Sequence, residues 1–280
     1  MNYRHAYHAG NFADVMKHTI LVRIIDYMKR KEKPFRIIDT HAGIGLYDLS
    51  CDEAQRTGEA ENGIAKLENP FNEAIEELLK PYRQVLTDTQ NRYDKSIYPG
   101  SPAIIRELIR REDRAIFVEL HPEDYSLLSE RYNHVTNIKV MHLDGWQALS
   151  ALIPPKEKRG LVLIDPPFEQ PDELNRMVSN LIQAVQKWPT GIYMAWYPIK
   201  ERRIIDKAWQ RLKSECSRTS LRAELMIQKP ADTGGLNGSG LFIINPPWLL
   251  ADELKLLLPA FARRLALEKS GDWTLSLQEK

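Results

Sequence analysis

Cysteine is almost absent from this chain, and long apolar runs are absent altogether. The 280 residues include only Cys51 and Cys216, which stand far apart and form no CxxC pair. A disulfide framework or a thiolate metal site is therefore not expected, and a reducing cytoplasm fits this composition. No stretch of about 18 apolar residues occurs, so we expect no membrane span. The first residues are polar and lack the apolar core of a signal peptide.

An excess of either charge is also lacking. The 39 basic and 38 acidic residues give a formal net charge of +1. Overall charge therefore gives no argument for nucleic-acid binding, and any basic surface must be local. The histidines show neither HExxH nor another metal-ligand spacing, so we expect no metal. With 43% hydrophobic residues, the chain is long enough for a packed core.

What the sequence does contain is an alternation of apolar strand-like runs and helical patterns. Several runs are continuously apolar, which is typical of strands buried on both faces of a parallel sheet. We predict an open, doubly wound α/β sheet of seven strands, mostly parallel and covered by helices. The predicted strands are Phe35–Asp39, Ala115–Leu120, Ile138–His142, Gly160–Ile164, Gly191–Trp196, Leu221–Ile227 and Leu241–Ile244. The predicted helices between and after them are Pro122–Tyr132, Trp146–Leu152, Asp172–Trp188, Lys200–Lys213 and Ala251–Leu267.

Two segments interrupt this alternation. Residues 1–33 precede the first strand and carry a helical pattern that begins near Asn11, a suitable N-cap. Residues 47–98 are charged and contain one amphipathic stretch, Phe71–Gln90, interrupted by Pro81. We read them as a helical insertion, because a simple first βα unit is shorter. The predicted parts are 1–46 with the first strand, 47–98 as an inserted helical subdomain, and 99–280 as the remainder, ending in a loosely packed tail over 270–280.

Four predicted strand ends carry residues suited to one nucleoside ligand. Gly43 follows the first strand, where a missing side chain lets the backbone approach a ligand. Glu119 ends the second strand and can bind both hydroxyls of a ribose. The pair Asp144-Gly145 follows the third and can meet an adenine edge, and Asp165 follows the fourth. The series predicts S-adenosylmethionine, since a nicotinamide dinucleotide site would carry GxGxxG.

The fourth strand end, Asp165-Pro166-Pro167-Phe168, is suited to holding an amine. Its prolines lack backbone N–H groups and fix the turn. The Asp165 carboxylate and the Pro166 carbonyl can then accept two hydrogen bonds from one amino group, while the Phe168 ring stacks on an unpaired base. This device fits alkylation of the exocyclic amine of an adenine, a cytosine or a glutamine. The alternative is a proline-rich turn in which Asp165 caps a helix.

Each of these residues also has a purely structural interpretation. His41 can be a turn histidine, Asp144 can cap the helix that begins at Trp146, and Glu119 can pair with a basic neighbour. The stretch Asn245–Trp248 nearly repeats the amine-holding motif. Because it follows the last predicted strand, we expect a structural turn there, with Trp248 packed.

Short motifs along most of the chain carry a specific resemblance. They are Tyr3-Arg4-His5, His8-Ala9-Gly10-Asn11, Ala13-Asp14-Val15, Lys17-His18, Asp39-Thr40-His41-Ala42-Gly43, Arg56-Thr57-Gly58-Glu59, Tyr98-Pro99-Gly100-Ser101-Pro102, Glu119-Leu120-His121-Pro122, Ile164-Asp165-Pro166-Pro167, Trp196-Tyr197-Pro198 and Asn245-Pro246-Pro247-Trp248. Together they resemble the bacterial 23S ribosomal RNA adenine-N6 methyltransferases known as methyltransferase J. The resemblance runs from residue 3 to about residue 250.

The resemblance implies a class I Rossmann-like, S-adenosylmethionine-dependent enzyme that methylates N6 of one adenosine in protein-free 23S ribosomal RNA and releases S-adenosylhomocysteine. It implies a cytoplasmic protein, and we expect a monomer. The implied cofactor contacts are His18, His41, Gly43, Ser101, Glu119, Asp144, Gly145 and Asp165. The implied catalytic positions are Asp165 as acceptor, Pro166, Phe168, Lys17 and His5, and the substrate contacts are Tyr3, in a mobile N-terminal lid, and Phe168. Many relatives carry Tyr at the position of Phe168. The Phe168 ring keeps the stacking surface but lacks the tyrosine hydroxyl.

RNA binding would also need phosphate contacts from local basic groups. The candidates are Arg4, Lys17, Arg23, Lys29-Arg30-Lys31, Lys200 and Arg202-Arg203. Three rival functions stay open: the same chemistry on DNA adenine or a protein glutamine, a non-catalytic RNA-binding or assembly protein on the same scaffold, and a dehydrogenase. Binding of S-adenosylhomocysteine separates the methyltransferase from the last of these.

Overall fold

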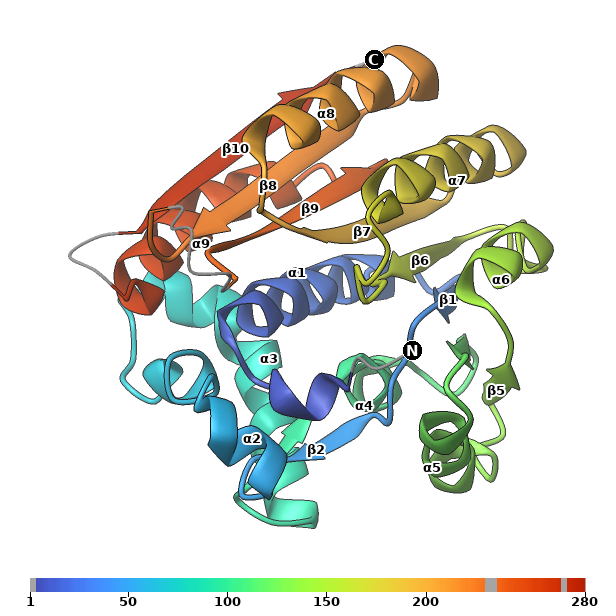
Figure 1. The fold of residues 1–280 in the computed structure, drawn as a ribbon. Helices are drawn as coiled ribbons and strands as arrows, with labels where there is room; N and C mark the ends of the chain where they lie inside the picture. The colour runs from blue at the N-terminus through green and yellow to red at the C-terminus, as the bar shows by residue number, and fades with distance from the viewer. Residues whose placement is uncertain (1–3, 230–235, 268–270, 280) are drawn as a thin grey trace.

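A computed structural model of the chain describes residues 4–229, 236–267 and 271–279. Its centre is an eight-stranded sheet in the order β10-β8-β9-β7-β6-β1-β4-β5 (Figure 1). From β7 through β6, β1 and β4 to β5 the neighbours run parallel, whereas β9, β8 and β10 join antiparallel. The strands are β1 (Arg36–Asp39), β4 (Arg114–Glu119), β5 (Ile138–His142), β6 (Gly160–Ile164), β7 (Ile192–Pro198), β8 (Ser220–Met226), β9 (Gly238–Ile244) and β10 (Asp272–Gln278). The predicted α/β sheet is confirmed, with one strand more than the seven expected.

The additional strand is β10, where we expected a loose tail. It pairs antiparallel with β8 along its whole length, with Trp273 opposite Leu225 and Leu277 opposite Leu221. Trp273, Leu275 and Leu277 alternate with polar residues, so β10 has one apolar face, and Leu275 packs against the main core. The expectation was therefore wrong over Asp272–Gln278.

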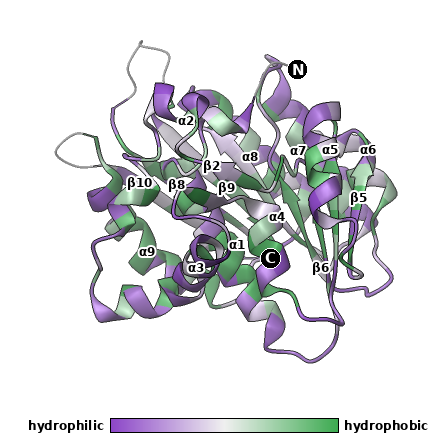
Figure 2. Cartoon of the chain, turned by 90° about the horizontal axis from the view of Figure 1, so that it is seen from below, coloured by the Kyte–Doolittle hydropathy of each residue, from purple (hydrophilic) through white to green (hydrophobic). Residues whose placement is uncertain are grey.

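Helices cover both faces of the sheet. Alternate strand residues point to opposite faces, so Leu161 and Leu163 join one apolar cluster and Val162 and Ile164 the other. The first cluster includes α1, α4, α5 and α9; the second includes α6, α7 and α8. Figure 2 shows the hydrophobic residues concentrated in the strands and the inner helix faces. The helices are α1 (Phe12–Lys29), α4 (Ser101–Leu108), α5 (Pro122–Tyr132), α6 (Gly145–Ala151), α7 (Glu173–Lys187), α8 (Arg202–Cys216) and α9 (Leu250–Leu265).

Helix α1 is buried on nearly every side. It begins at the predicted N-cap, where the Asn11 side chain accepts a hydrogen bond from the Asp14 N–H. Beyond the predicted helical pattern, 15 of its 18 residues are buried. The reason is that α3, α4 and α9 all pack against α1, in addition to β9 of the sheet. Several polar residues of α1 are consequently buried, among them Asp14, Lys17 and His18.

The residues that we predicted as an insertion lie between two short strands. Strands β2 (Leu46–Asp48) and β3 (Ile97–Pro99) pair antiparallel, and between them lie α2 (Asp52–Thr57), the 3-10 helix η2 (Ile64–Leu67) and α3 (Glu73–Arg92). Helix α3 continues through Pro81, so the expected interruption is wrong. Its buried Leu79 and Tyr82 belong to the same apolar cluster as α1. The division into a separate subdomain stays a prediction.

The second proline pair forms a structural turn. Asn245 has a left-handed backbone, with φ 52°, and its side-chain amide donates to the Pro189 and Gly191 carbonyls. Because β9 runs antiparallel to β7, this turn lies at the opposite edge of the sheet from Asp165. Trp248 is 73% exposed, so our expectation that it packs was wrong.

Candidate active site

A cavity of about 610 Å³ opens at the carboxyl ends of the parallel strands. The loops that follow β6, β1, β4 and β5 reach it in that order, because those strands are successive neighbours in the sheet. Parallel strands bring their carboxyl ends to one edge, where α/β proteins bind ligands. The predicted site residues that line it are His5, Lys17, His18, His41, Gly43, Ser101, Glu119, Asp144, Gly145, Asp165, Pro166 and Phe168. Tyr3 lies outside the described residues.

The Gly43 loop is tied to Glu119. The Gly43 N–H donates to Glu119 Oε2 at 2.8 Å, and the His121 N–H donates to Oε1 at 2.8 Å. Gly43 has φ +62°, and a Cβ there would lie 2.3 Å from the Tyr47 hydroxyl, so any other residue would be strained and would displace that hydroxyl. Burial raises the pKa of the Glu119 carboxyl. No basic side chain pairs with this carboxylate in the described part of the chain, and each oxygen keeps a second lone pair.

His41 presents one defined ring nitrogen to a ligand. The Thr40 hydroxyl donates to the Leu163 carbonyl at 2.9 Å, so at 2.8 Å it must accept from His41 Nδ1–H. Burial lowers the pKa of His41 to about 4, and the ring is neutral at pH 7. Nδ1 is therefore satisfied within the turn, as the structural interpretation required, while Nε2 remains an acceptor.

Asp144 is the N-cap of α6. Its Oδ1 accepts from the Trp146 and Gln147 N–H groups, at 2.9 and 3.0 Å. The capping interpretation of this residue is thus correct, and it leaves Oδ2 beside the cavity, 3.9 Å from the Arg176 guanidinium. Arg176 in turn lies over the Trp146 ring, 5.4 Å from its centre. The cofactor role of Asp144 stays a prediction.

Ser101 and His18 are tied to buried groups behind the cavity. The Ser101 hydroxyl donates to Asp39 Oδ2 at 2.6 Å, and burial raises the pKa of Asp39 to about 7. His18 Nδ1 lies 2.8 Å from the Tyr98 hydroxyl, and burial lowers the pKa of His18 to about 3. His18 is therefore a neutral hydrogen-bonding group and carries no charge to the site.

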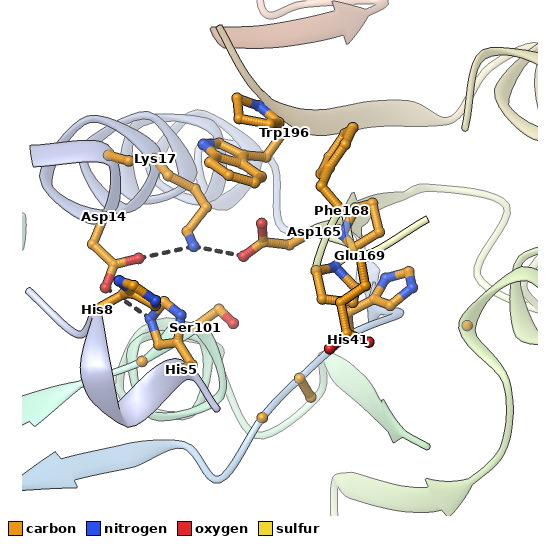
Figure 3. Close-up of a pocket in the computed structure, with 18 of the residues that line it drawn as sticks. His5, His8, Asp14, Lys17, His41, Ser101, Asp165, Phe168, Glu169 and Trp196 are labelled. Atoms are coloured by element: carbon orange, nitrogen blue, oxygen red, sulfur yellow. Dashed lines mark hydrogen bonds and ion pairs between the residues drawn. The ribbon is translucent and has the colours of Figure 1, made fainter. Parts of the chain in front are cut away.

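Lys17 joins two carboxylates at the centre of the cavity (Figure 3). Its Nζ lies 2.5 Å from Asp165 Oδ2 and 2.9 Å from Asp14 Oδ1, and the side chain is 5% exposed. His5, in the 3-10 helix His5–Tyr7, places Nε2 at 2.9 Å from the other Asp14 oxygen. Asp14 thus connects the N-terminal segment to Lys17, and Lys17 connects it to Asp165.

The charges in this group fix their ionisation states. Burial alone would lower the pKa of Lys17, but the Asp14 and Asp165 carboxylates outweigh it and raise that pKa. Burial alone would raise the pKa of Asp14, but His5 and Lys17 hold it well below its usual range. Lys17 is therefore a cation at neutral pH and cannot accept a proton.

An aromatic wall stands beside Asp165. Phe168 has a left-handed backbone, with φ 51°, and its ring meets Trp196 edge to face at 5.6 Å between centres. Trp196, from β7, also lies under Lys17, with Nζ 6.0 Å from its ring centre. Both rings line the cavity (Figure 3), so a flat ligand has two aromatic neighbours next to a carboxylate.

Sequence reasoning missed several residues of this site, among them Asp14, Glu59 and Trp196. Asp14 and Trp196 stood in the recognised motifs but had no assigned role. The available signal for Asp14 was its position: three residues before Lys17 on a helix, it shares a face with that lysine. Glu59 also stood in a recognised motif, Arg56–Glu59, without an assigned role. Its contact with the site depends on long-range packing of α2 beside the N-terminal 3-10 helix.

The described residues contain neither a metal-binding cluster nor a membrane-spanning helix. Among residues 4–229, 236–267 and 271–279, no group of three or more His, Cys, Asp or Glu side chains could hold a metal ion. Within the same ranges, no helix is long and apolar enough to cross a membrane.

The strand order and the cavity at the strand ends define a Rossmann-like methyltransferase fold. The family model described as "Ribosomal RNA large subunit methyltransferase D, RlmJ" matches residues 32–278. Two proteins named ribosomal RNA large subunit methyltransferase J, from Haemophilus influenzae and Escherichia coli, are each 38% identical; the matches cover 98% and 99% of this chain and 98% of each relative. A crystal structure of a Legionella pneumophila protein superposes with a TM-score of 0.85 at 34% identity, over 96% of this chain and 98% of that one. The chain belongs to this family of ribosomal RNA large subunit methyltransferases.

Proposed function

We propose that this protein transfers a methyl group from S-adenosylmethionine to N6 of an adenosine in 23S ribosomal RNA. The observation that carries the proposal is the position of Asp165, which lies at the end of β6 in the same cavity as the Gly43 loop and Glu119. In this proposal, the carboxylate that accepts a hydrogen bond from the amine lies beside the residues that bind the nucleoside. The chain's family membership supports ribosomal RNA as the substrate.

The cavity suits the cofactor in size and in chemistry. Its volume of about 610 Å³ is within the range of small-molecule sites. Glu119 keeps lone pairs for ribose hydroxyls, and His41 Nε2 and Asp144 Oδ2 supply two further acceptors. When bound, S-adenosylmethionine supplies a methyl group activated by its sulfonium. The protein's part is to hold that group in line with the acceptor nitrogen.

Asp165 holds the acceptor amine in this proposal. Lys17 contacts its Oδ2, so the carboxylate keeps lone pairs, chiefly on Oδ1, for one N6 proton. The Pro166 carbonyl accepts the other. Because the adenine N6 lone pair is delocalised into the ring, two such bonds favour a more nucleophilic nitrogen, and positioning supplies most of the acceleration. Lys17 is a cation, so the proton released on methyl transfer goes to Asp165 and then to solvent.

The aromatic wall selects a flat, extruded base. Phe168 and Trp196 offer stacking surfaces that accept any unpaired base, and the hydrogen bonds at Asp165 select an amino group. Extruding a base from a helix costs a few kcal/mol, less in a loop. This supports a single-stranded or loosely paired RNA target.

Other substrates with an amino group are the closest rivals. DNA adenine and protein glutamine would meet the same two acceptors, and only the family supports RNA over them. A non-catalytic scaffold is disfavoured by the intact arrangement of Asp165, Lys17 and Asp14. We further propose that the protein acts as a monomer in the bacterial cytoplasm.

The test is transfer of labelled methyl to deproteinised 23S ribosomal RNA, followed by nucleoside chromatography. Wild-type protein should place the label in N6-methyladenosine, and Asp165→Ala should not, while both should bind S-adenosylhomocysteine. Asp172→Ala, an exposed carboxylate outside the cavity lining, is the control and should retain transfer. Label in another nucleoside would overturn the N6 assignment, and no cofactor binding by the wild type would overturn the methyltransferase assignment.

A further inference from the structure

One carboxylate of the segment 47–98 reaches the active-site cavity. Of these residues, only Tyr47 and Glu59 line the cavity in the part of the chain that the structure describes. Glu59 follows Gly58, the residue with a left-handed backbone that ends α2, and it lies in the motif Arg56–Glu59. The proposed methyl transfer gives no residue of this motif a role. Its contacts therefore need a separate explanation.

Glu59 binds two residues of the N-terminal segment, residues 4–11 ahead of α1, at once. Oε1 lies 2.9 Å from His8 Nδ1, and Oε2 accepts from the Asn11 side-chain amide at 2.9 Å. The side-chain oxygen of the same Asn11 accepts from the Asp14 N–H at 2.9 Å. One end of the Asn11 amide is thus held by Glu59, and the other end caps α1. Glu59 consequently fixes the orientation of the group that starts α1.

The start of α1 carries the residues that reach Asp165. Asp14 accepts from the Gly10 N–H at 2.9 Å and lies 2.9 Å from both His5 Nε2 and Lys17 Nζ. Lys17 then meets Asp165 at 2.5 Å. A continuous series of contacts leads from Glu59 through Asn11 and Asp14 to Lys17 and Asp165, and the inner part of it is drawn in Figure 3.

The backbone around Glu59 packs against the backbone of residues 7–10, and these contacts fix the position of the Glu59 carboxylate. The Ile64 N–H donates to the Gly10 carbonyl at 2.8 Å, and the Thr57 hydroxyl donates to the Tyr7 carbonyl. A Cβ on Gly63 would lie 2.1 Å from the Gly10 carbonyl oxygen, so the two backbones are in direct contact. Counted together with Glu59, the segment 47–98 therefore holds the residues before α1 at three points: Tyr7, the Gly10 carbonyl, and the His8 and Asn11 side chains.

We propose that Glu59 is a positioning residue for methyl transfer, which holds His8, Asn11 and hence the start of α1 so that Lys17 and Asp165 keep their places in the cavity. The proposal rests on the proposed function. It gives the segment 47–98 a direct part in the active site, because that segment supplies the anchor for the N-terminal residues.

Glu59→Ala is the test variant, and Glu61→Ala is the control. Glu61 is exposed, two residues along the chain, and carries the same charge. We expect Glu59→Ala to lower kcat tenfold or more, with a smaller change in the KM for RNA and in S-adenosylhomocysteine affinity. Glu59→Gln should recover part of the rate, since its carbonyl oxygen can still accept from Asn11. The double variant Glu59→Ala with Asn11→Ala should be no slower than the slower single variant.

Hydrogen–deuterium exchange of residues 7–15 provides a readout that does not depend on catalysis. Exchange there should rise in Glu59→Ala and stay at the wild-type level in Glu61→Ala. Unchanged exchange in Glu59→Ala, or a rate loss that follows only a lowered melting temperature, would overturn the proposal. If the wild-type protein transfers no methyl to RNA, the proposed function fails, while the exchange comparison still decides whether Glu59 anchors α1.

Discussion

Lys17 carries its charge in a place where a lysine is costly unless it is paired. Its ammonium is nearly buried, and the two carboxylates that compensate it come from α1 and from the end of β6. The same contacts that stabilise the charge also fix the Asp165 side chain. In the proposed reaction, stability and catalysis therefore depend on one group of three residues.

Replacing Lys17 by Met should leave two carboxylates without their cation. Removal of one partner of a buried ion pair costs about 3 kcal/mol or more, so we expect a loss of this order in the free energy of unfolding at pH 7. Urea titration measures it. Asp14→Asn combined with Lys17→Met should recover part of the loss, because one uncompensated charge is removed. Equal stability of Lys17→Met and wild type would contradict the ion-pair interpretation.

Asp39 should make the protein less stable as the pH rises. Burial raises the pKa of this carboxyl from 3.8 to about 7. Between these values the unfolded chain releases the proton while the folded chain keeps it. The contribution of Asp39 to the free energy of unfolding is therefore fully present below about pH 4 and decreases until about pH 7. The loss is on the order of 4 kcal/mol. Urea unfolding measures the free energy of unfolding of Asp39→Asn and of wild type at each pH. The value for the variant minus that for wild type should rise across this window and stay level above pH 8. A flat difference would exclude a raised pKa.

Among the secondary-structure elements, the continuously apolar strands could be predicted from the sequence. Burial on both faces leaves a run such as Gly160–Ile164 with no polar residue, and the end of that run placed Asp165 correctly. Strand β10 was missed because it lies at the sheet edge, where only one face is apolar. The signal was the alternation of Trp273, Leu275 and Leu277.

The contacts of α1 could not be predicted from the sequence in the same way. Periodicity indicates one apolar face, but whether the opposite face is covered depends on where α3 and α4 pack, and that depends on long-range topology. The burial of Asp14 follows from this packing, and the reach of Glu59 follows from the packing of α2 beside the N-terminal 3-10 helix. The strand-end residues of the site could therefore be predicted from local patterns, and Lys17 and His18 of α1 from the family resemblance alone. The contacts of Asp14 and Glu59 could not be predicted.

The close packing between η2 and the start of α1 leads to a prediction with a matched pair of glycines. Gly63 has φ −116° and ψ −106°, outside the helical and extended regions, and a Cβ there would also collide with the Gly10 and Asn11 backbone. Gly58 has φ +60° and open space around it. We expect Gly58→Ala to cost about 1 kcal/mol from its left-handed backbone, and Gly63→Ala to cost clearly more and to raise hydrogen exchange at the start of α1. A smaller effect at Gly63 would mean that this contact adjusts freely.

Taken over the full chain, the charge is nearly balanced, so RNA phosphates need a local basic surface. Most of the basic groups that the sequence offered are not available for it. Lys17 and Arg23 are buried in ion pairs with acidic partners. Residues 29–31 lie at the end of α1, just before β1 begins, and therefore at the side of the sheet opposite the cavity. Lys200 lines the active-site cavity, and Arg203 and Lys207, a few residues further along the chain, line a second hollow on α8. All three are exposed, and no ion pair joins them to the described residues.

The exposed cations at the start of α8 should therefore contact the RNA backbone. We expect Arg203→Gln with Lys207→Gln to weaken RNA binding and to reduce the slope of log K against log salt by about 1 to 2, since each lost phosphate contact removes about 0.7 to 0.9. Lys31→Gln with Lys33→Gln removes the same charge from exposed positions at the far edge and should change neither quantity. Fluorescence titration of a labelled RNA fragment at several salt concentrations measures both. An equal loss in the two variants would mean that RNA responds only to net charge, and no loss in either would place the phosphate contacts elsewhere on the protein.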